Sequence, residues 1–532
     1  MRIAGVQNRP VELALGTSAE ELVDCLFTDP DGMELRVPAF QDADGEWRVR
    51  YASPLVGEHR YSEGRVEIRA YEGDNPLLRH GPVRVGADGR GFEHADGTPF
   101  LWLADTWWLA FVERLSWPDD FRRLTADRVG KGFSVIQVVA GLYPEMPPFD
   151  SRGDASDGWP WTEGFGTVNA GWWDEADLRL AWLVSSGLAP CVVASWGYHL
   201  LWTGEETMKR HWREVIARWG AYPVVWCLAG EATLPYYPDI FGERGPEVSA
   251  RLRTGWANVA AYVRATDPYG RALTVHPSPG DGCFSSHDIF PEDPSLYDFT
   301  MLQTGHWDRQ DFSSTLEVVE RELAREPRKP VLNGEVCYEG IMSASWHDTQ
   351  RFLVWTHLLS GAAGHSYGAQ GVWGMNTGSF VGEAGSWSDA TWEEAYRLPG
   401  SAHVGLAGKL LEPYRWWEFE PHQEWVEPHA HEQDRLLPYA AGIPDEVRVV
   451  YLPSSAVMVS PASDKPSFAL QEIRLRELGP GWVARFVNPR TGAALPELQV
   501  EPDTAGEWVI SGGFLTSAPS MEDWLLVLER DR

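Results

Sequence analysis

The chain has 532 residues, of which 43% are apolar, so it exceeds one ordinary hydrophobic core and two or three domains are expected. Its 45 Lys and Arg residues stand against 77 Asp and Glu residues, which gives a formal net charge of −32. Nucleic acid and anionic membranes would be repelled by this charge, so we expect neither as a partner.

Residues 1–80 alternate apolar and polar side chains between short turn signals, such as Asp29-Pro-Asp-Gly32 and Asp42-Ala-Asp-Gly45. This pattern predicts short strands and therefore an N-terminal β-sandwich. Asn75-Pro76 is expected to link it to the next domain. The expected strands are 11–15, 25–27, 33–37, 47–51 and 66–70.

Residues 81–434 begin with an expected hairpin and then alternate strands with long helical segments, a pattern typical of a (β/α)₈ barrel. The expected barrel strands are 100–108, 134–140, 188–195, 224–231, 272–276, 299–303, 331–335 and 364–367. The main expected helices are 118–130, 174–186, 207–219, 247–266, 313–326, 345–361 and 401–411.

Residues 435–532 return to short strands, expected at 447–452, 471–475, 482–486, 508–510 and 524–528. They predict a C-terminal β-sandwich. The predicted fold class is therefore α/β, a (β/α)₈ barrel flanked by an N-terminal and a C-terminal β-sandwich domain.

Two of the expected barrel strands end in a Gly-Glu pair, Gly230-Glu231 and Gly334-Glu335. Chemistry in such barrels takes place at the carboxyl ends of the strands. A retaining glycosidase needs two carboxylates about 5 Å apart, whereas an inverting one needs about 6.5–9.5 Å. We assign Glu335 as the nucleophile and Glu231 as the acid/base; the alternative for each is a loop carboxylate held in a salt bridge.

Other polar and aromatic residues at or just beyond the strand ends are expected to bind substrate. Trp and Tyr suit the C–H faces of sugars, and the chain has 28 Trp residues. Asp105 could instead cap a turn, the histidines could be structural, and Tyr338 could serve packing. The expected substrate-binding residues are Asp105, Trp107, Gln137, Trp196, His199, His276, Gln303, His306, Tyr338 and Tyr367, with a cleft wall formed by Trp159, Trp161, Trp172 and Trp173.

Other chemistries find less support in the sequence. Gly364-His-Ser-Tyr-Gly368 matches GxSxG by letter, but the residues after Ser366 are those of a loop, whereas a nucleophile elbow needs a helix there. His429 and His431 have no carboxylate-rich partner segment, and the aspartates at positions 150, 154 and 157 suit a solvated loop. We therefore expect neither a metal nor a cofactor.

The cysteines and the start of the chain bear on location. Five cysteines form no CxxC pair, and Cys283 with His287 lacks the second pair of a zinc site. The chain starts without the apolar segment of a signal peptide and has no run long enough to span a bilayer. A reduced, cytoplasmic location is expected.

Three stretches resemble the apiosidase-like barrels of glycoside hydrolase family 140: Phe100-Leu-Trp-Leu-Ala-Asp-Thr-Trp-Trp108, Trp226-Cys-Leu-Ala-Gly-Glu231 and Pro330-Val-Leu-Asn-Gly-Glu-Val-Cys-Tyr-Glu-Gly340. Residues 482–496 and 523–528 resemble the terminal β-sandwich of those proteins. That family typically has Gly-Asp at the fourth strand, whereas this chain has Gly230-Glu231, one methylene longer. The resemblance implies retaining hydrolysis of a terminal furanosyl residue without a metal.

The sequence thus predicts an exo-acting retaining glycosidase that removes apiose or an arabinofuranose from a small glycoside or oligosaccharide. A homo-oligomer is compatible with this interpretation. Two alternatives stay open: a transglycosylase that uses the same carboxylates, and a non-catalytic carbohydrate-binding or sensor protein.

Overall fold

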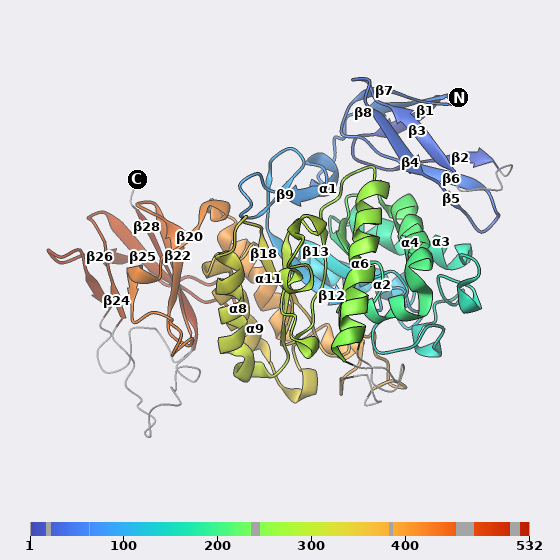
Figure 1. Ribbon diagram of the computed structural model, residues 1–532. Coiled ribbons are helices and arrows are strands. Elements are labelled where there is room, and N and C mark those ends of the chain that lie inside the picture. Colours follow the sequence, from blue (N-terminus) through green and yellow to red (C-terminus); the bar gives the residue numbers. More distant parts are fainter. Residues whose placement is uncertain are drawn as a thin grey trace.

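The computed structural model describes residues 2–16, 23–62, 64–235, 245–381, 387–453, 473–510 and 522–530. A barrel occupies the centre of the molecule, with the N-terminal sheets at one end and the C-terminal sheets at the other (Figure 1). The predicted α/β barrel with flanking antiparallel sheets is confirmed. No helix in these described ranges is long and apolar enough to cross a membrane.

The N-terminal region consists of two sheets that share one core. The five-stranded sheet has the order β1 (Arg2–Val6), β8 (Gly64–Arg69), β7 (Gly57–Tyr61), β3 (Asp24–Thr28) and β4 (Glu34–Pro38). The three-stranded sheet has the order β2 (Val11–Gly16), β6 (Trp47–Tyr51) and β5 (Phe40–Gln41). Alternate side chains of both sheets, such as Phe27, Val49 and Val66, are buried between them, which is the alternation that the sequence shows.

The connection to the barrel is a short helix rather than a bare linker. Asn75 accepts a hydrogen bond from the Leu77 N–H, and Pro76 begins helix α1 (Pro76–Arg79). Asn at the N-cap and Pro at the first helical position are the residues that favour such a start. A three-stranded sheet of β9 (Val83–Val85), β10 (Phe92–His94) and β11 (Pro99–Phe100) follows.

Eight parallel strands form the barrel wall, and each of them is buried. Their order is β16 (Leu273–Thr274), β15 (Val225–Cys227), β14 (Ala189–Val193), β13 (Val135–Val139), β12 (Trp102–Trp107), β19 (Gly364–Tyr367), β18 (Val331–Val336) and β17 (Thr300–Gly305). Between β16 and β17, the Asp298 N–H donates to the carbonyl of Leu273 at 2.7 Å. The sheet is therefore nearly closed, and all strand carboxyl ends meet at one mouth.

Helices cover the outside of the barrel (Figure 1). They are α2 (Asp119–Lys131), α3 (Ala170–Ser185), α4 (Leu200–Trp219), α6 (Pro246–Thr266), α8 (Phe312–Leu323), α9 (His347–Leu359) and α11 (Pro399–Leu411), with single turns at α7 (Ser286–Ile289) and α10 (Trp392–Ala395). Helix α4 begins at Leu200, seven residues before the expected 207. Its backbone departs from helical geometry at Gly204, whose φ is 68°, and is helical again beyond that residue. Short 3-10 turns lie at Ser151–Gly153, Glu163–Phe165, Gly197–His199, Pro279–Asp281, Pro294–Leu296, Asp308–Asp311, Ile341–Ser343, Trp416–Glu418 and Gln423–Trp425.

The C-terminal region again consists of two sheets around a core that includes Trp425, Leu475 and Leu526. The six-stranded sheet has the order β20 (Glu420–Pro421), β22 (Tyr439–Ile443), β23 (Val447–Leu452), β28 (Trp524–Arg530), β25 (Trp482–Val487) and β26 (Leu498–Val500). The three-stranded sheet has the order β21 (Val426–Glu427), β24 (Ile473–Leu475) and β27 (Trp508–Ile510). The first strand of these sheets begins at Glu420. The first two residues of the expected strand 471–475 lie outside the described residues.

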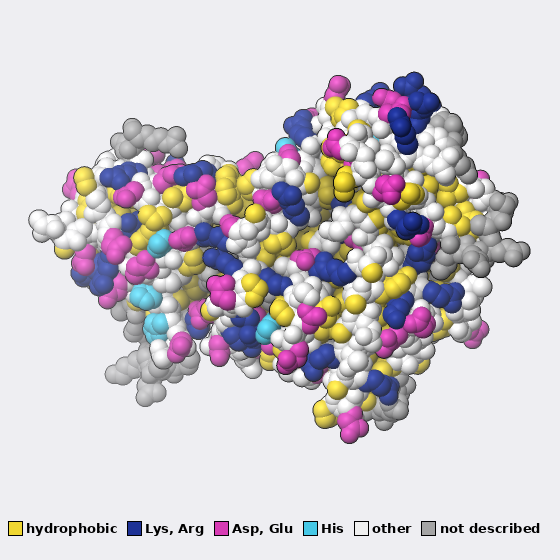
Figure 2. Space-filling view, turned by 45° about the horizontal axis from the view of Figure 1, so that its top comes forward, with side chains coloured by type: hydrophobic (Ala, Val, Ile, Leu, Met, Phe, Trp, Pro, Cys, Tyr) yellow, Lys and Arg dark blue, Asp and Glu magenta, His cyan; other side chains and the backbone are white. Residues whose placement is uncertain are grey.

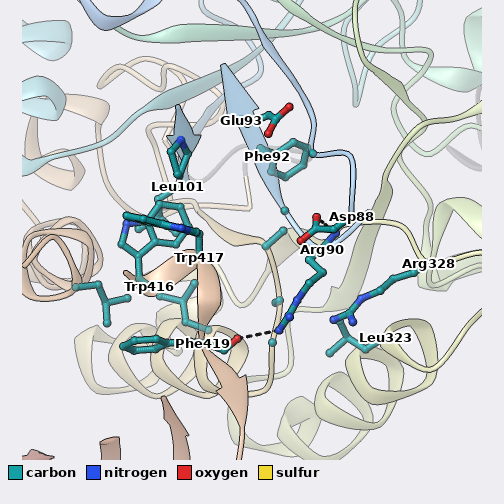
Figure 3. A pocket seen from close by; sticks show the side chains of 18 of the residues that line it. Asp88, Arg90, Phe92, Glu93, Leu101, Leu323, Arg328, Trp416, Trp417 and Phe419 are labelled. Carbon is teal, nitrogen blue, oxygen red and sulfur yellow. Dashed lines mark hydrogen bonds between the residues drawn. The ribbon is translucent and has the colours of Figure 1, made fainter. Parts of the chain in front are cut away.

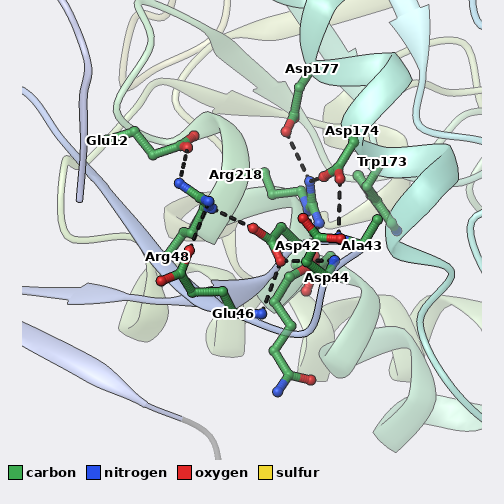
Figure 4. Close-up of polar contacts among 12 residues, drawn as sticks. Glu12, Asp42, Ala43, Asp44, Glu46, Arg48, Trp173, Asp174, Asp177 and Arg218 are labelled. Carbon is green, nitrogen blue, oxygen red and sulfur yellow. Dashed lines mark hydrogen bonds and ion pairs between the residues drawn. The ribbon is translucent and has the colours of Figure 1, made fainter. Parts of the chain in front are cut away.

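A buried ion network joins the N-terminal sheets to the barrel (Figure 4). Asp177 of α3 contacts Arg50 of β6 at 2.7 Å and Arg218 of α4 at 2.8 Å, and it accepts from the Trp219 indole at 2.7 Å. Burial opposes ionisation of Asp177, yet the two guanidinium groups hold its pKa below the usual value. We refer to Arg50, Asp177 and Arg218 as the interface network.

The surface carries both signs of charge in close mixture. On the face that Figure 2 shows, Lys and Arg side chains lie among Asp and Glu side chains rather than in separate patches. The net charge of −32 is thus not concentrated in a single acidic region of that face.

Candidate active site

Glu231 and Glu335 both line a cavity of about 480 Å³ at the carboxyl ends of the strands. Glu335 is the next-to-last residue of β18, and Glu231 follows β15. Each is almost buried, with exposed fractions of 9% for Glu231 and 7% for Glu335. The two Gly-Glu strand ends of the sequence are therefore brought to one site.

The glycine that precedes each glutamate makes room for a neighbouring side chain. A Cβ on Gly334 would lie 2.6 Å from Cγ of Met301, and a Cβ on Gly230 would overlap the indole ring of Trp196. Glu231 itself adopts a φ of 43°, a left-handed conformation that costs free energy for a residue with a side chain. The backbone is thus shaped to place the Glu231 carboxyl group beside Trp196.

Three neutral donors hold the carboxyl group of Glu231. Trp196 Nε1 donates to Oε2 at 3.1 Å, while Ser278 Oγ and Gln303 Nε2 approach Oε1 at 3.0 and 3.1 Å. Burial, and next the negative charge of Glu335, raise the pKa of Glu231 above its usual value despite these donors. Neutral donors stabilise a carboxylate less than a positive charge would, so the protonated form is favoured.

Glu335 has the opposite environment, because two histidines face it. His306 Nε2 lies 3.0 Å from Oε1, and His276 Nε2 lies 3.3 Å from Oε2. Burial alone would raise the pKa of Glu335, but hydrogen bonding and charge from His276 and His306 lower it to about 2. The side chain of Glu335 is therefore ionised over the ordinary pH range.

The hydrogen-bond partners of the two histidines differ. His276 Nδ1 lies 2.8 Å from the carbonyl oxygen of Pro277, so both of its ring nitrogens face oxygen atoms. His306 Nδ1 instead accepts from the Tyr338 N–H at 3.4 Å. Both histidines therefore face Glu335 with Nε2, while backbone groups contact their Nδ1 atoms.

Aromatic rings close the inner part of the cavity around these groups. Trp108 Nε1 donates to the Tyr338 hydroxyl at 3.1 Å, and the rings of Trp108 and Trp196 lie 5.7 and 5.9 Å from that of His276. Burial, and next the charge of Glu335, raise the pKa of the Tyr338 phenol well above its usual value. These rings shield the two carboxyl groups from water, which strengthens their electrostatic interaction.

Five of the ten expected substrate-binding residues lie at this site. Trp196, Gln303, His306 and Tyr338 line the cavity, and His276 contacts Glu335 from behind.

The other five expected residues do not line the cavity. Asp105 is fully buried against Arg128 at 2.6 Å and accepts from the Trp107 indole at 2.6 Å, because its side chain points from β12 toward the helices. Gln137 donates to Thr106 Oγ1 and to the Gly334 carbonyl, each at 3.0 Å, inside the barrel. The carboxylate of Asp105 and the side-chain amide nitrogen of Gln137 therefore bind groups of the protein itself.

The remaining two have similar internal partners. His199 Nε2 contacts the Tyr143 carbonyl at 2.8 Å, and burial lowers the pKa of His199 to about 3. Tyr367 donates to the buried carboxyl group of Glu339 at 2.6 Å. The four tryptophans expected as a cleft wall, Trp159, Trp161, Trp172 and Trp173, are buried and do not line the cavity.

Sequence reasoning missed several residues of the site. Trp108 lies three residues beyond Asp105, and side-chain alternation puts it on the opposite face of the strand, toward the cavity. Ser278 lies two residues beyond His276, where the expected strand 272–276 ends, so its position near a strand end was a signal that could have identified it. Glu145, Trp307, Trp373 and Trp387 also line the cavity, and they come from loops whose course has no signal in a single sequence.

The alternative motifs do not form a second catalytic site in the described structure. Ser366 is fully buried on β19, and Asp150 pairs with Arg152 at 2.9 Å. No group of three or more His, Cys, Asp and Glu side chains within the described residues is arranged to hold a metal ion. None of the five cysteines forms a disulfide, and all five are buried.

A second cavity of about 460 Å³ lies at the opposite end of the barrel (Figure 3). Its lining residues precede barrel strands rather than follow them; Leu101 comes before β12 and Arg328 before β18. Arg90 in this cavity pairs with Glu420 at 2.8 Å, and the exposed ring of Trp417 forms part of its wall. It is separate from the strand ends that carry Glu231 and Glu335.

The barrel and its two strand-end glutamates define a glycoside hydrolase-like protein. Residues 86–418, well over half of the chain, match the apiosidase-like catalytic domain, and the chain belongs to the apiosidase-like family. Residues 18–64 match a domain of unknown function, DUF5060. The resemblance to apiosidase-like barrels is thereby confirmed, and the placement in family 140 stays a prediction.

Solved structures share the fold. A glycoside hydrolase family 5 protein from Bacteroides vulgatus is 20% identical, with a TM-score of 0.67 over 86% of this chain and 95% of that chain. A protein described as a glycoside hydrolase is 20% identical, with a TM-score of 0.64 over 86% and 99%. A putative glycoside hydrolase from the same Bacteroides species is 16% identical, with a TM-score of 0.66 over 99% and 100%. No curated protein matches the chain.

Proposed function

We propose that the protein is a retaining exo-glycoside hydrolase in which Glu335 is the nucleophile and Glu231 the acid/base. The observation that carries the proposal is the meeting of two buried glutamates at one cavity, one beside two histidines and the other held by three neutral donors, which displaces the two carboxyl pKa values in opposite directions. That of Glu335 is lowered to about 2 and that of Glu231 is raised. One ionised and one protonated carboxyl group are what double displacement requires before the first step.

In the first step, a carboxylate oxygen of Glu335 attacks the anomeric carbon, while Glu231 gives its proton to the departing oxygen. The glycosidic bond breaks and a glycosyl ester forms on Glu335. In the second step, Glu231 removes a proton from water, the water oxygen attacks the anomeric carbon, and the ester bond breaks. The free sugar leaves, and both carboxyl groups return to their starting states.

The change of role of Glu231 follows from the same electrostatics. The negative charge of Glu335 contributes to the raised pKa of Glu231. Esterification removes that charge, so the pKa of Glu231 falls and its carboxyl group becomes able to act as a base. Ser278, Gln303 and Trp196 then stabilise the carboxylate.

For the substrate, we propose a terminal furanosyl residue, apiose or arabinofuranose, on a small glycoside or oligosaccharide. Membership of the apiosidase-like family supports this sugar class. A cavity of about 480 Å³ accommodates one sugar ring and part of its leaving group, which suits an exo-acting enzyme. None of the steps above needs a cofactor.

The test is a screen of aryl furanosides with the wild-type enzyme, Glu335→Ala and Glu231→Ala. We expect one furanoside to be cleaved, Glu335→Ala to be inactive, and azide to restore turnover of Glu231→Ala. Proton NMR of the first product, and of the glycosyl azide, should show retention at the anomeric carbon. Inversion, or activity that survives the loss of Glu335, would contradict the assignment.

The same experiment separates the two alternatives. A transglycosylase would form an alkyl glycoside in preference to free sugar when an acceptor alcohol is added. A non-catalytic carbohydrate-binding protein would bind the sugars in calorimetry and cleave no member of the panel.

A further inference from the structure

The loop 337–345, which follows Glu335 and leads to α9, has a strained backbone. Four of its residues that carry side chains have a positive φ, a conformation that costs free energy and persists only where surrounding contacts hold it. These residues are Cys337, Met342, Ser343 and Ser345, with φ values of 40°, 50°, 58° and 55°. The loop also lines the active-site cavity, through Tyr338, Ile341 and Met342. Its shape is therefore part of the candidate site.

Tyr338 connects this loop to the candidate nucleophile. Its backbone N–H donates to His306 Nδ1 at 3.4 Å, and His306 Nε2 lies 3.0 Å from Glu335 Oε1. The rings of Tyr338 and His306 lie 4.7 Å apart, and the Tyr338 hydroxyl accepts from Trp108 Nε1 at 3.1 Å. Because His306 is one of the two histidines that lower the pKa of Glu335, a displaced loop would disturb that pKa.

Glu339, the residue after Tyr338, holds the loop from outside the cavity. Its side chain is fully buried and does not line the cavity. Oε2 accepts from the Tyr367 hydroxyl of β19 at 2.6 Å, and Oε1 accepts from the N–H of Gly400, in the first turn of α11, at 3.0 Å. A Cβ on Gly400 would overlap Oε2 of Glu339, so this close approach requires glycine. One carboxyl group thus joins the loop to a barrel strand and to a helix.

The loop has a second anchor in Gln350 of α9, which is also fully buried. Gln350 Nε2 donates to the carbonyl of Cys337 at 2.6 Å and to that of Ser345 at 2.9 Å, one at each end of the loop. Gln350 therefore fixes the two ends of the loop, whereas Glu339 fixes the residue next to Tyr338.

Glu339 is an unusual residue to bury. Burial raises its pKa to about 7, against the hydrogen bonds from Tyr367 and Gly400 and the positive charges of Arg128 and Lys131 on α2. Both of its oxygens nevertheless face donors, so the ionised group can accept from both. Burial of an ionisable group is unfavourable unless its contacts compensate, and these contacts are the ones that fix the loop.

We propose that Glu339 is a positioning residue of the proposed hydrolase, which fixes loop 337–345 against β19 and α11 so that Tyr338 and His306 keep the Glu335 carboxylate in place. The inference rests on the proposed function and adds to it a residue outside the cavity. Glu339 contacts neither the sugar nor the reacting atoms. Its effect reaches Glu335 through the Tyr338 N–H and the ring of His306.

The test compares Glu339→Ala with Glu339→Gln. Alanine removes both acceptors, so kcat/KM should fall about 10- to 100-fold, mainly through kcat, and the acid limb of the pH profile should move up from about 2 toward 4.5. Glutamine keeps the size of the side chain. Its oxygen can accept from the Gly400 N–H and its amide can donate to the Tyr367 oxygen, so most of the activity should be retained. The titratable groups that face Glu335 in this profile include Glu231, His276, His306 and Tyr338.

Two further variants keep the test decisive. Glu322→Ala is the matched control, because Glu322 of α8 is also a buried glutamate but pairs with Arg321 and Arg325 at 2.8 and 2.7 Å. It should lower Tm and leave the acid limb unchanged. If Glu339→Ala does not fold, Tyr367→Phe removes only the hydrogen bond to Oε2 and should move the acid limb in the same direction by a smaller amount. An unchanged acid limb in the folded variant, or an equal shift in Glu322→Ala, would overturn the inference.

Hydrogen exchange followed by mass spectrometry keeps this inference separate from the hydrolase function, because it reports on the loop without substrate. Faster exchange of residues 337–345 in Glu339→Ala, together with the shifted acid limb, supports the inference. Faster exchange without hydrolysis of any glycoside by the wild type supports the anchoring of the loop by Glu339 and contradicts the proposed function. Hydrolysis by the wild type with unchanged exchange in the variant supports the function and contradicts the inference.

Discussion

The interface network and the active site are both buried groups of charges, but they are balanced differently. In the network, Asp177 lies between Arg50 and Arg218, and its pKa is lowered. In the active site, His276 and His306 contact Glu335, whereas neutral donors hold Glu231. One region pairs its charges within the fold, and the other leaves a proton on one carboxyl group.

This difference separates stability from function. A buried carboxylate with two cationic partners stays ionised, because the two positive charges stabilise its negative charge. A carboxyl group such as Glu231, which is held by neutral donors beside another carboxylate, has a raised pKa that depends on the charge of that neighbour. The structure therefore predicts that substitutions in the two regions affect different quantities.

The largest expected effect is on catalysis. Glu335→Gln keeps the size of the side chain but removes the nucleophilic carboxylate, so kcat should fall by about 10⁴-fold or more. Steady-state kinetics with an aryl furanoside measure this loss. A loss of less than about tenfold would show that another group attacks the sugar.

The same pair of glutamates should also affect stability in opposite directions. The folded pKa of Glu335 is depressed to about 2, so its contribution is present above its unfolded value of 4.5 and is lost as the pH falls through about 2. The folded pKa of Glu231 is raised, so ionisation of Glu231 destabilises the fold as the pH rises above 4.5. Thermal unfolding at neutral pH should therefore show a lower Tm for Glu335→Gln and a higher Tm for Glu231→Gln.

The second effect concerns the interface network. Arg218→Ala leaves Asp177 with one guanidinium partner in a buried site, and we expect the free energy of unfolding to fall by about 3–5 kcal/mol. Arg48→Ala is the control: its side chain is 31% exposed, and its ion pairs should contribute only about 0–1 kcal/mol. Urea unfolding measures both. The kcat of the folded Arg218→Ala enzyme should match that of the wild type, and a large loss of kcat would show that the network also shapes the active site.

The third effect is a shift in pH dependence. Activity needs Glu335 ionised, so the acid limb of the kcat/KM profile should lie near the pKa of Glu335, about 2. His306→Asn removes one of the two histidines that lower this pKa, and the acid limb should move up toward the ordinary value of 4.5. A profile measured in the acid range checks this shift. An unchanged acid limb would mean that His276 alone holds the Glu335 carboxylate.

The sequence predicted the barrel and both strand-end glutamates because these features are local. Buried strands that end in Gly-Glu are visible as apolar runs, and helical periodicity marks the segments between them. Asp105 shows the limit of this reasoning. Its place at a strand end was right, but the face of the strand toward which it points depends on the register of the whole barrel, which brings it to Arg128.

The loops mark a second limit. Trp307 and Trp387 are far apart in the chain and line one cavity. Nothing in their local sequence shows that they meet, because the path of a long loop is decided by tertiary contacts. Likewise, the order of the strands supports the proposed roles of Glu231 and Glu335, whereas the two histidines that contact Glu335 are visible only in the structure.

The smallest effect should come from Ser278→Ala. Ser278 Oγ donates to Glu231 Oε1 at 3.0 Å and therefore stabilises the ionised form of that carboxyl group. Its loss should raise the pKa of Glu231 further and move the alkaline limb of the pH profile, where Glu231 loses its proton, to higher pH. Because Trp196 and Gln303 still donate, the shift should be well under that of the acid limb in His306→Asn.

A double variant, Ser278→Ala with His306→Asn, tests whether the two limbs of the pH profile are independent. If each histidine or donor acts on its own carboxyl group, the two limbs should move independently, whereas a coupled shift would mean that the two glutamates titrate as one unit.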